Sequence, residues 1–241
     1  MIVRLEAQDF TERLLEEEKM LILNVPYREK DEAKALGARW NPQIKKWYVR
    51  NKEDYYKFIR WIEPYGNMVI IDELYLVEGI QKCFRCGKET RVIGFGVDKH
   101  LSVDEIRELQ EDYGGDIKNV LETGINQEDI HIVGPINPIP DPLMKYIQKK
   151  YNYKMRYSQT TRSSNVCNCC EHCDVLQGDF YLFNEVDSPF FIYSPEDVKK
   201  LKIYKIPLEY DLIVNADDGW ASFDEMFKRY GNIVPLDIKL T

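Results

Sequence analysis

The sequence predicts an α+β protein in two parts, a small β-α-β-α module at residues 19–66 and a larger α+β domain at residues 67–241. In the first part, short apolar runs alternate with amphipathic helical segments. In the second part, strand-like segments flank two groups of cysteines, and helix-capping patterns occur between and after them. The 10 Phe, 16 Tyr and 4 Trp supply enough large apolar side chains for folded cores, so disorder throughout is excluded.

The elements of the first part are predicted from apolar runs and their caps. We expect residues 1–18 to form an acidic N-terminal helix. Because this segment has no apolar stretch, we expect no targeting signal in it. Pro26 ends the first strand, Gly37 suits the C-cap of the next helix, and the turn residues 64–67 suit a linker. The expected elements are a helix at Thr11–Lys19, a strand at Met20–Val25, a helix at Lys30–Leu36, a strand at Lys46–Val49 and a helix at Asp54–Ile62.

The second part begins with two predicted strands and continues with capped helices. Ser102 opens a capping-box pattern, which predicts a helix that ends near Gly114. Four prolines between residues 135 and 142 exclude regular structure up to Asp141, which can begin a helix with Pro142 at its first position. The other expected elements are strands at Met68–Val77, Thr90–Val97 and Val175–Phe183, a helix at Asp116–Glu122, and helices that start at Ser194 and Ser222.

All six cysteines of the chain fall in two short segments. The first contains Cys83 and Cys86, and the second is Cys167-Asn168-Cys169-Cys170-Glu171-His172-Cys173. A Cys-x-x-Cys turn aims two thiolates at one ion, and two such turns complete a tetrahedral zinc shell. We therefore expect a zinc-ribbon domain with a long insertion, residues 88–166, between its halves. Four thiolates leave no position for water or substrate, so the expected Zn²⁺ is structural.

The second cysteine segment leaves the choice of ligands open, because it offers both Cys170-x-x-Cys173 and Cys167-x-x-Cys170. With the first choice, Cys167 and Cys169 are additional thiols near the site. His172 lies inside the turn, and we expect its side chain to point outward. The alternative to a metal site is a set of buried core thiols or a redox pair.

Residues 23–49 contain the run Leu-Asn-Val-Pro-Tyr, then Ala-Leu-Gly-Ala-Arg-Trp-Asn, and end on Trp-Tyr-Val. The segment resembles a short bacterial domain of unknown function with the signature L-x-V-P-[YF]-x-x-K-[DE]-x-A-[KR]-x-x-G-A-[RK]-W-[DN]-x5-W-[YF]-V. Members of that family are accessory modules of plasmid-type primases and other DNA-processing proteins. The resemblance covers the module alone, and it implies a nucleic-acid context for it.

A second resemblance lies around the cysteines, in Cys83–Lys88 and in the run Leu176-Gln177-Gly178-Asp179 that follows the second segment. Both runs resemble uncharacterised bacterial four-cysteine zinc-ribbon proteins, in which the cysteine three residues before the leucine is the last ligand. The metal ligands that this resemblance implies are Cys83, Cys86, Cys170 and Cys173. The chain departs from the pattern at Asp174, where glycine is usual, and in the additional Cys167 and Cys169.

The chain has a formal net charge of −8, which excludes a globally basic nucleic-acid-binding protein. Residues 19–60 differ, since they hold eleven basic and five acidic residues interleaved with aromatic ones. Basic side chains beside exposed rings suit contact with phosphates and stacking on bases. We expect Trp40 and Trp47 to form the core of the module, with base stacking as the alternative. The candidate phosphate contacts are Lys30, Lys34, Arg39, Lys45 and Lys46.

The patterns favour a non-enzymatic protein, because the chain has three histidines and no P-loop, GxGxxG or HExxH motif. We expect a cytoplasmic zinc-binding protein without a membrane span, which binds DNA, RNA or a nucleic-acid-processing partner. One alternative is a protein-interaction adaptor that uses the acidic second part, where residues 67–241 hold 29 acidic and 20 basic residues. Another is an enzyme whose site lies in residues 88–166.

Overall fold

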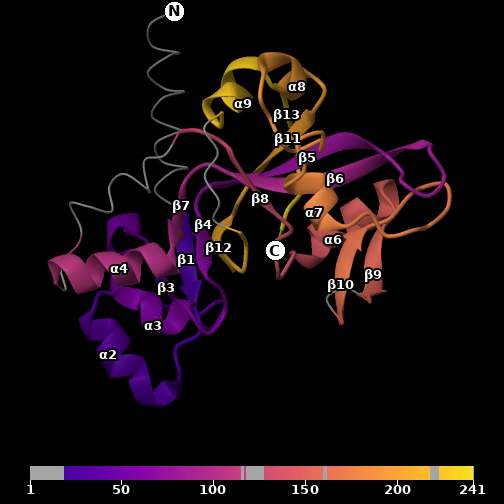
Figure 1. Ribbon diagram of the computed structural model, residues 1–241. Helices are drawn as coiled ribbons and strands as arrows, with labels where there is room; N and C mark the ends of the chain where they lie inside the picture. Colours follow the sequence, from indigo (N-terminus) through magenta and orange to yellow (C-terminus); the bar gives the residue numbers. More distant parts are fainter. Residues whose placement is uncertain (1–18, 115–116, 118–127, 160–161, 218–222, 241) are drawn as a thin grey trace, which may run out of the picture. The chain divides into compact units, whose positions relative to one another are not determined.

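The computed structural model describes residues 19–114, 117, 128–159, 162–217 and 223–240 (Figure 1). These residues form both helices and strands, which confirms the predicted α+β class. Apart from Lys19 and Ile117, the helices expected at Thr11–Lys19 and Asp116–Glu122 lie outside the described residues. The chain divides into two compact units. Unit 1 comprises Met1–Asp72, Lys99–Gln127 and Leu208–Val214, and unit 2 comprises Glu73–Asp98, Glu128–Pro207 and Asn215–Thr241.

Unit 1 contains a six-stranded sheet with the strand order β2-β3-β1-β12-β4-β7. β1 pairs in parallel with β12, and the other neighbouring strands are antiparallel. The strands are β1 (Met20–Leu23), β2 (Arg39–Asn41), β3 (Lys46–Val49), β4 (Met68–Ile70), β7 (His100–Ser102) and β12 (Tyr210–Val214). The helices are η1 (Tyr27–Glu29) and η2 (Lys52–Phe58), both 3₁₀, and α2 (Lys30–Ala35), α3 (Ile59–Ile62) and α4 (Val103–Tyr113).

This sheet joins the module to later parts of the chain. β4, β7 and β12 come from beyond residue 66, so the sheet crosses the boundary that the sequence predicted there. Leu21 and Leu23 of β1 are fully buried. Leu21 lies opposite Val49 of β3, so all three side chains are on one face of the sheet. They share one core with Tyr55 and Phe58 of η2. The helices on this side therefore cover the apolar face of the sheet.

Three elements of unit 1 differ from the predictions. The strand β2 was not predicted; it forms because Asn41 Oδ1 accepts the backbone N–H groups of Gln43 and Ile44 in a turn that leads back into β3. The helix predicted at Asp54–Ile62 is a 3₁₀ helix followed by the short α3. The strand predicted at Met68–Val77 is interrupted at residues 71–72, where Asp72 adopts a left-handed φ of +64°, and a separate strand begins at Glu73.

Unit 2 contains a five-stranded sheet with the order β13-β11-β5-β6-β8, and a separate β9–β10 hairpin. The strands are β5 (Glu73–Lys82), β6 (Glu89–Val97), β8 (His131–Gly134), β9 (Tyr153–Ser158), β10 (Ser163–Asn168), β11 (Lys202–Pro207) and β13 (Asn232–Pro235). The helices are α6 (Asp141–Lys150), α7 (Asp179–Phe183), α8 (Pro195–Lys199) and α9 (Glu225–Tyr230). Aromatic and branched side chains from β5, β6, α7, α8 and α9 form its core.

The strand predicted at Val175–Phe183 is wrong over most of its length. Leu176 makes one isolated bridge with Cys169, and Asp179–Phe183 is the helix α7. The helical turn directs Leu182 into the core and packs Phe183 against it, and Asp179 lies in the first turn, where a negative charge is favourable. Burial of these apolar side chains outweighs the strand preference of the aromatic residues.

Candidate metal centre and basic module

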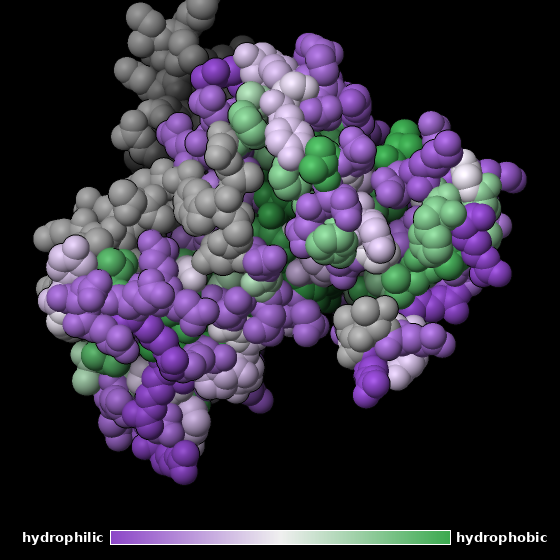
Figure 2. Space-filling model, viewed as in Figure 1, coloured by the Kyte–Doolittle hydropathy of each residue, from purple (hydrophilic) through white to green (hydrophobic). Residues whose placement is uncertain are grey.

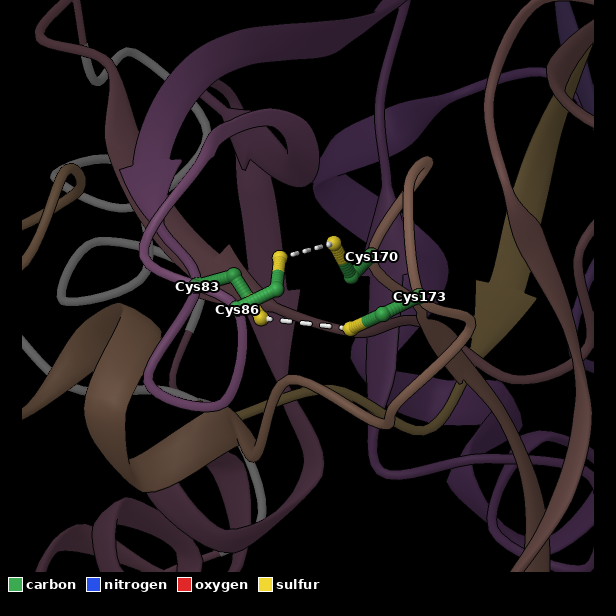
Figure 3. Close-up of side chains that lie close together, drawn as sticks. All are labelled: Cys83, Cys86, Cys170 and Cys173. Atoms are coloured by element: carbon green, nitrogen blue, oxygen red, sulfur yellow. Dashed lines mark hydrogen bonds between the residues drawn. The ribbon is translucent and has the colours of Figure 1, made fainter.

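The structure brings together the sulfur atoms of four cysteines (Figure 3). Cys83 Sγ lies 3.7 Å from Cys173 Sγ, and Cys86 Sγ lies 3.7 Å from Cys170 Sγ. All four sulfurs lie within 4.8 Å of one another. A tetrahedral shell with metal–sulfur bonds of about 2.3 Å places its sulfurs about 3.8 Å apart. The cluster could therefore hold one metal ion.

The first cysteine pair lies in the loop that joins β5 and β6, where Lys82 and Glu89 form the last pair of the hairpin. The backbone N–H of Cys83 donates to the carbonyl of Lys88 at 2.9 Å, and the N–H of Gly87 donates to the carbonyl of Cys83 at 2.9 Å. Gly87 has a φ of +71°, which glycine adopts without steric cost. The hairpin and these two bonds fix the first Cys-x-x-Cys turn, or knuckle.

The second knuckle follows β10 and repeats the same hydrogen bonds. The backbone N–H of Cys170 donates to the carbonyl of Val175 at 2.8 Å, and the N–H of Asp174 donates to the carbonyl of Cys170 at 3.0 Å. Asp174 thus takes the place that Gly87 has in the first knuckle, and its φ of +62° is also left-handed. The departure from glycine at this position therefore preserves the turn.

Polar contacts hold Asp174 in this conformation. Its carboxylate lies 2.5 Å from Lys154 Nζ, forms an ion pair with Arg156, and accepts a hydrogen bond from Asn152 Nδ2 at 2.9 Å. Lys154 and Arg156 belong to β9, so the neighbouring hairpin supports the second knuckle.

The backbone around the first knuckle favours a thiolate. Burial opposes ionisation of the Cys83 thiol, but the backbone N–H groups of Cys86 and Arg85 donate toward its sulfur and lower its pKa to about 6. The thiolate is the form of cysteine that binds metal ions. The backbone of this turn therefore favours the metal-binding form of Cys83.

Two polar side chains that support the knuckles had no part in the prediction from cysteine spacing. Gln177 Nε2 donates to Cys83 Sγ at 3.6 Å, and Asn152 Nδ2 donates to the carbonyl of Cys170 at 2.8 Å. Because Gln177 lies shortly after the last cysteine, its position in the sequence could have indicated a contact with the site. Asn152 lies 18 positions before Cys170, and no local pattern marks it.

The remaining thiols and the histidine lie outside the four-sulfur cluster. Cys167 and Cys169 are buried, and each directs its sulfur toward a backbone carbonyl oxygen, at 3.7 and 3.9 Å. His172 Nε2 lies 2.9 Å from the carbonyl oxygen of Glu89. Of the two registers that the sequence left open, the structure brings Cys170-x-x-Cys173 to the first pair.

The five candidate phosphate contacts lie on three elements of unit 1 and in one turn between them. They are Lys30 and Lys34 on α2, Arg39 on β2, Lys45 in the following turn and Lys46 on β3. Lys30 Nζ lies 4.0 Å from the ring centroid of Tyr27, which is 82% exposed. Lys45 and Lys46 line one pocket, whose lining does not include the other three. Hydrophilic side chains cover most of the surface over α2 and α4 on the face drawn in Figure 2.

The two tryptophans of the module differ in burial. Trp40 and Trp47 lie directly opposite each other on β2 and β3, with ring centroids 5.7 Å apart. Trp47 is half-buried and packs against the core of unit 1, whereas Trp40 is 49% exposed. The expectation of core packing is therefore wrong for Trp40, because β2 is the last strand at its end of the described sheet.

Residues 20–63 match the family model described as "Domain of unknown function (DUF5710)". A segment of the chain is 54% identical over 41 residues to "DNA primase TraC" of Escherichia coli, and another protein of that name and organism is 56% identical over 39 residues. The matches cover 17% and 16% of this chain but only 3% and 4% of the two primases. No solved structure matches the chain significantly.

These matches confirm that the N-terminal module is similar to a domain associated with a primase. The resemblance of the cysteine-containing remainder to zinc-ribbon proteins stays a prediction. Among the helices that the structure describes, none is both long and apolar enough to cross a membrane.

Proposed function

We propose that this protein is a non-enzymatic zinc-binding protein whose N-terminal module binds nucleic acid or docks on a nucleic-acid-processing partner. The four-sulfur cluster carries the first half of the proposal. The similarity of residues 20–63 to a segment of a DNA primase supports the second half.

Zn²⁺ is the metal that this donor set fits best. Four thiolates at tetrahedral spacing match structural zinc sites, in which protein ligands fill every coordination position. The β5–β6 hairpin supplies one knuckle and the segment after β10 supplies the other, as in a zinc ribbon with residues 88–166 inserted. In this role Zn²⁺ joins two distant segments of unit 2 and performs no reaction.

The electrostatics of the module support contact with phosphates. Residues 19–60 carry eleven basic and five acidic residues in a chain whose net charge is −8. Lys34, Arg39, Lys45 and Lys46 are exposed, which leaves their charges accessible to a polyanion. Lys30 and Lys34 are four residues apart on α2 and so share one face of the helix.

The test is nucleic-acid binding by fluorescence anisotropy at two salt concentrations, with the intact chain. Counterion release predicts a steep loss of affinity as salt rises if phosphates are contacted. Lys30→Glu with Lys34→Glu should weaken binding at least tenfold. The matched control is Lys199→Glu with Lys200→Glu in unit 2, which reverses the same charge on exposed residues and should leave binding unchanged. If wild type binds neither single strands nor duplexes at low salt, the protein-interaction adaptor becomes the better proposal.

A further inference from the structure

Unit 1 has a pocket of about 330 Å³ beside the β2–β3 hairpin, which we call the tryptophan pocket. Its lining includes Trp40, Trp47 and Tyr65, together with Lys45 and Lys46. The charged side chains of the lining are both lysines. A pocket of this size is at the small end of the range for ligand sites, and it suits a single planar group.

Two aromatic side chains of the tryptophan pocket are about half exposed. Trp40 is 49% exposed and Tyr65 is 47% exposed. The planes of Trp40 and Trp47 are inclined at 64°, in an edge-to-face arrangement, so the two rings do not stack in parallel on each other. Half-exposed aromatic faces of this kind lose water favourably when another flat ring stacks on them.

The position of Trp40 follows from the sheet. Along the row of facing residues from β1 to β2, Leu23 is fully buried, Trp47 is half-buried and Trp40 is the most exposed. The hairpin turn that places Trp40 opposite Trp47 also requires a left-handed residue, and Lys45 has a φ of +52° there. The stacking surface and the positive charge thus come from the same β2–β3 hairpin.

The second lysine is held beside the pocket. Lys46 Nζ lies 2.5 Å from Asn24 Oδ1, and both residues belong to the lining. A hydrogen bond to a neutral amide leaves the ammonium charge of Lys46 uncompensated. The two lysines therefore give the aromatic pocket a positive rim that suits the phosphates on either side of a base.

We propose that the tryptophan pocket holds an unpaired base of a single-stranded nucleic acid, with Trp40 as the stacking surface and Lys45 and Lys46 as phosphate contacts. This inference rests on the proposed nucleic-acid binding of the module and adds the class of ligand. A base in a duplex is already stacked and must first leave its neighbours to enter the pocket. The pocket should therefore favour single strands over duplexes.

The test compares a labelled oligothymidine with a DNA duplex of the same length, in anisotropy titrations of the intact chain. Trp40→Ala should weaken single-strand binding about 5- to 150-fold, the loss expected for one stacked base. Duplex binding should change less than twofold. Trp40→Phe keeps a ring and should recover part of the affinity. Lys45→Glu should instead reduce the slope of log affinity against log salt concentration by about one, the change expected when one phosphate contact is lost. The control is Tyr113→Ala, which removes a 67% exposed ring from α4.

The outcomes separate this inference from the proposed function. If Lys30→Glu with Lys34→Glu weakens binding but Trp40→Ala changes single-strand affinity less than twofold, the stacking site is overturned and nucleic-acid binding stands. If duplex and single strand bind equally well and Trp40→Ala weakens both alike, the inference also fails. Circular dichroism checks the fold of each variant. Should Trp40→Ala not fold, Trp40→Leu, which keeps an apolar side chain but removes the ring, replaces it under the same criteria.

Discussion

Cys83 Sγ and Cys173 Sγ lie 3.7 Å apart, although the two residues are 90 positions apart in the sequence. A contact of this length between thiols suits two ligands of one ion. The hairpin of β5 and β6 brings the first sulfur to the site, and the knuckle after β10 brings the second. The cluster thus ties the two ends of a long insertion together within unit 2.

The first prediction concerns metal content. The purified chain should contain about one zinc ion, because the four sulfurs form one tetrahedral set. Cys173→Ala should reduce the zinc content, measured by elemental analysis, to a small fraction of the wild-type value. Cys167→Ala is the matched control, since Cys167 is a buried thiol outside the cluster, and it should keep the ion. Equal zinc loss in both variants would contradict this ligand assignment.

The second prediction concerns the stability that the ion supplies. Structural zinc contributes about 10–16 kcal/mol of apparent binding free energy in zinc-finger peptides, as much as the whole stability of a typical domain. Cys86→Ser, or removal of metal with a chelator, should therefore unfold the region around the knuckles. Thermal melting followed by circular dichroism measures the change. An unchanged melting curve after both treatments would mean that the cluster is not a structural metal site.

The third prediction concerns the left-handed residue of the second knuckle. Asp174→Gly should change stability little, because glycine removes the strain at φ +62° while the exposed ion pairs that are lost contribute little. Asp174→Val should cost about 1–2 kcal/mol more, since a branched side chain opposes this conformation. Urea unfolding compares the variants. Equal stability of the Gly and Val variants would contradict the role assigned to this backbone position.

The fourth prediction concerns the pH dependence of unit 1. Asp72 is buried, which raises its pKa, but the hydrogen bond and charge of Lys52 and the charges of Lys19 and Lys99 outweigh burial and lower the pKa below its ordinary 3.8. The carboxylate is thus preferred in the folded state. The contribution of this carboxylate to the free energy of unfolding is complete above pH 3.8. It is lost as the pH falls through the lower pKa that Asp72 has in the folded state.

Asp72→Asn should accordingly lower the free energy of unfolding by about 2 kcal/mol at pH 7, as expected for a buried hydrogen bond to a charged group. Asparagine tolerates the left-handed conformation of this residue, so the backbone should not change. The difference from wild type should shrink in acid and vanish below the folded pKa. Glu63→Gln, in the exposed pair with Arg107, is the control and should have little effect. A difference that persists unchanged at pH 2 would argue against this origin.

The fifth prediction separates the two tryptophans of the module. Trp47→Ala should destabilise unit 1 by about 3 kcal/mol, because Trp47 packs against its core. Trp40→Ala should cost about 1 kcal/mol, mainly through loss of the edge-to-face contact between the rings. Urea unfolding monitored by far-UV circular dichroism measures both. A larger loss for Trp40→Ala would show that Trp40 is a core residue.

Features that depend on neighbours in the chain could be predicted from the sequence. Ser102 caps α4 as expected, since its Oγ accepts the backbone N–H of Glu105 three residues later. The helix expected from Asp141 begins there, with Pro142 in its first turn. Each knuckle forms through hydrogen bonds between residues no more than five positions apart, so Cys-x-x-Cys spacing is sufficient to indicate it.

Features that depend on distant residues were decided by the tertiary structure. β1 pairs with β12, which lies at residues 210–214. No pattern in residues 19–66 predicts a partner strand so far away in the sequence. α7 is helical because Leu182 and Phe183 pack on the core of unit 2, although its aromatic residues favour a strand. Trp40 is exposed and Trp47 is half-buried because their strands differ in distance from the sheet edge. Capping and turn geometry are local energies, whereas strand pairing and burial depend on which distant surfaces meet.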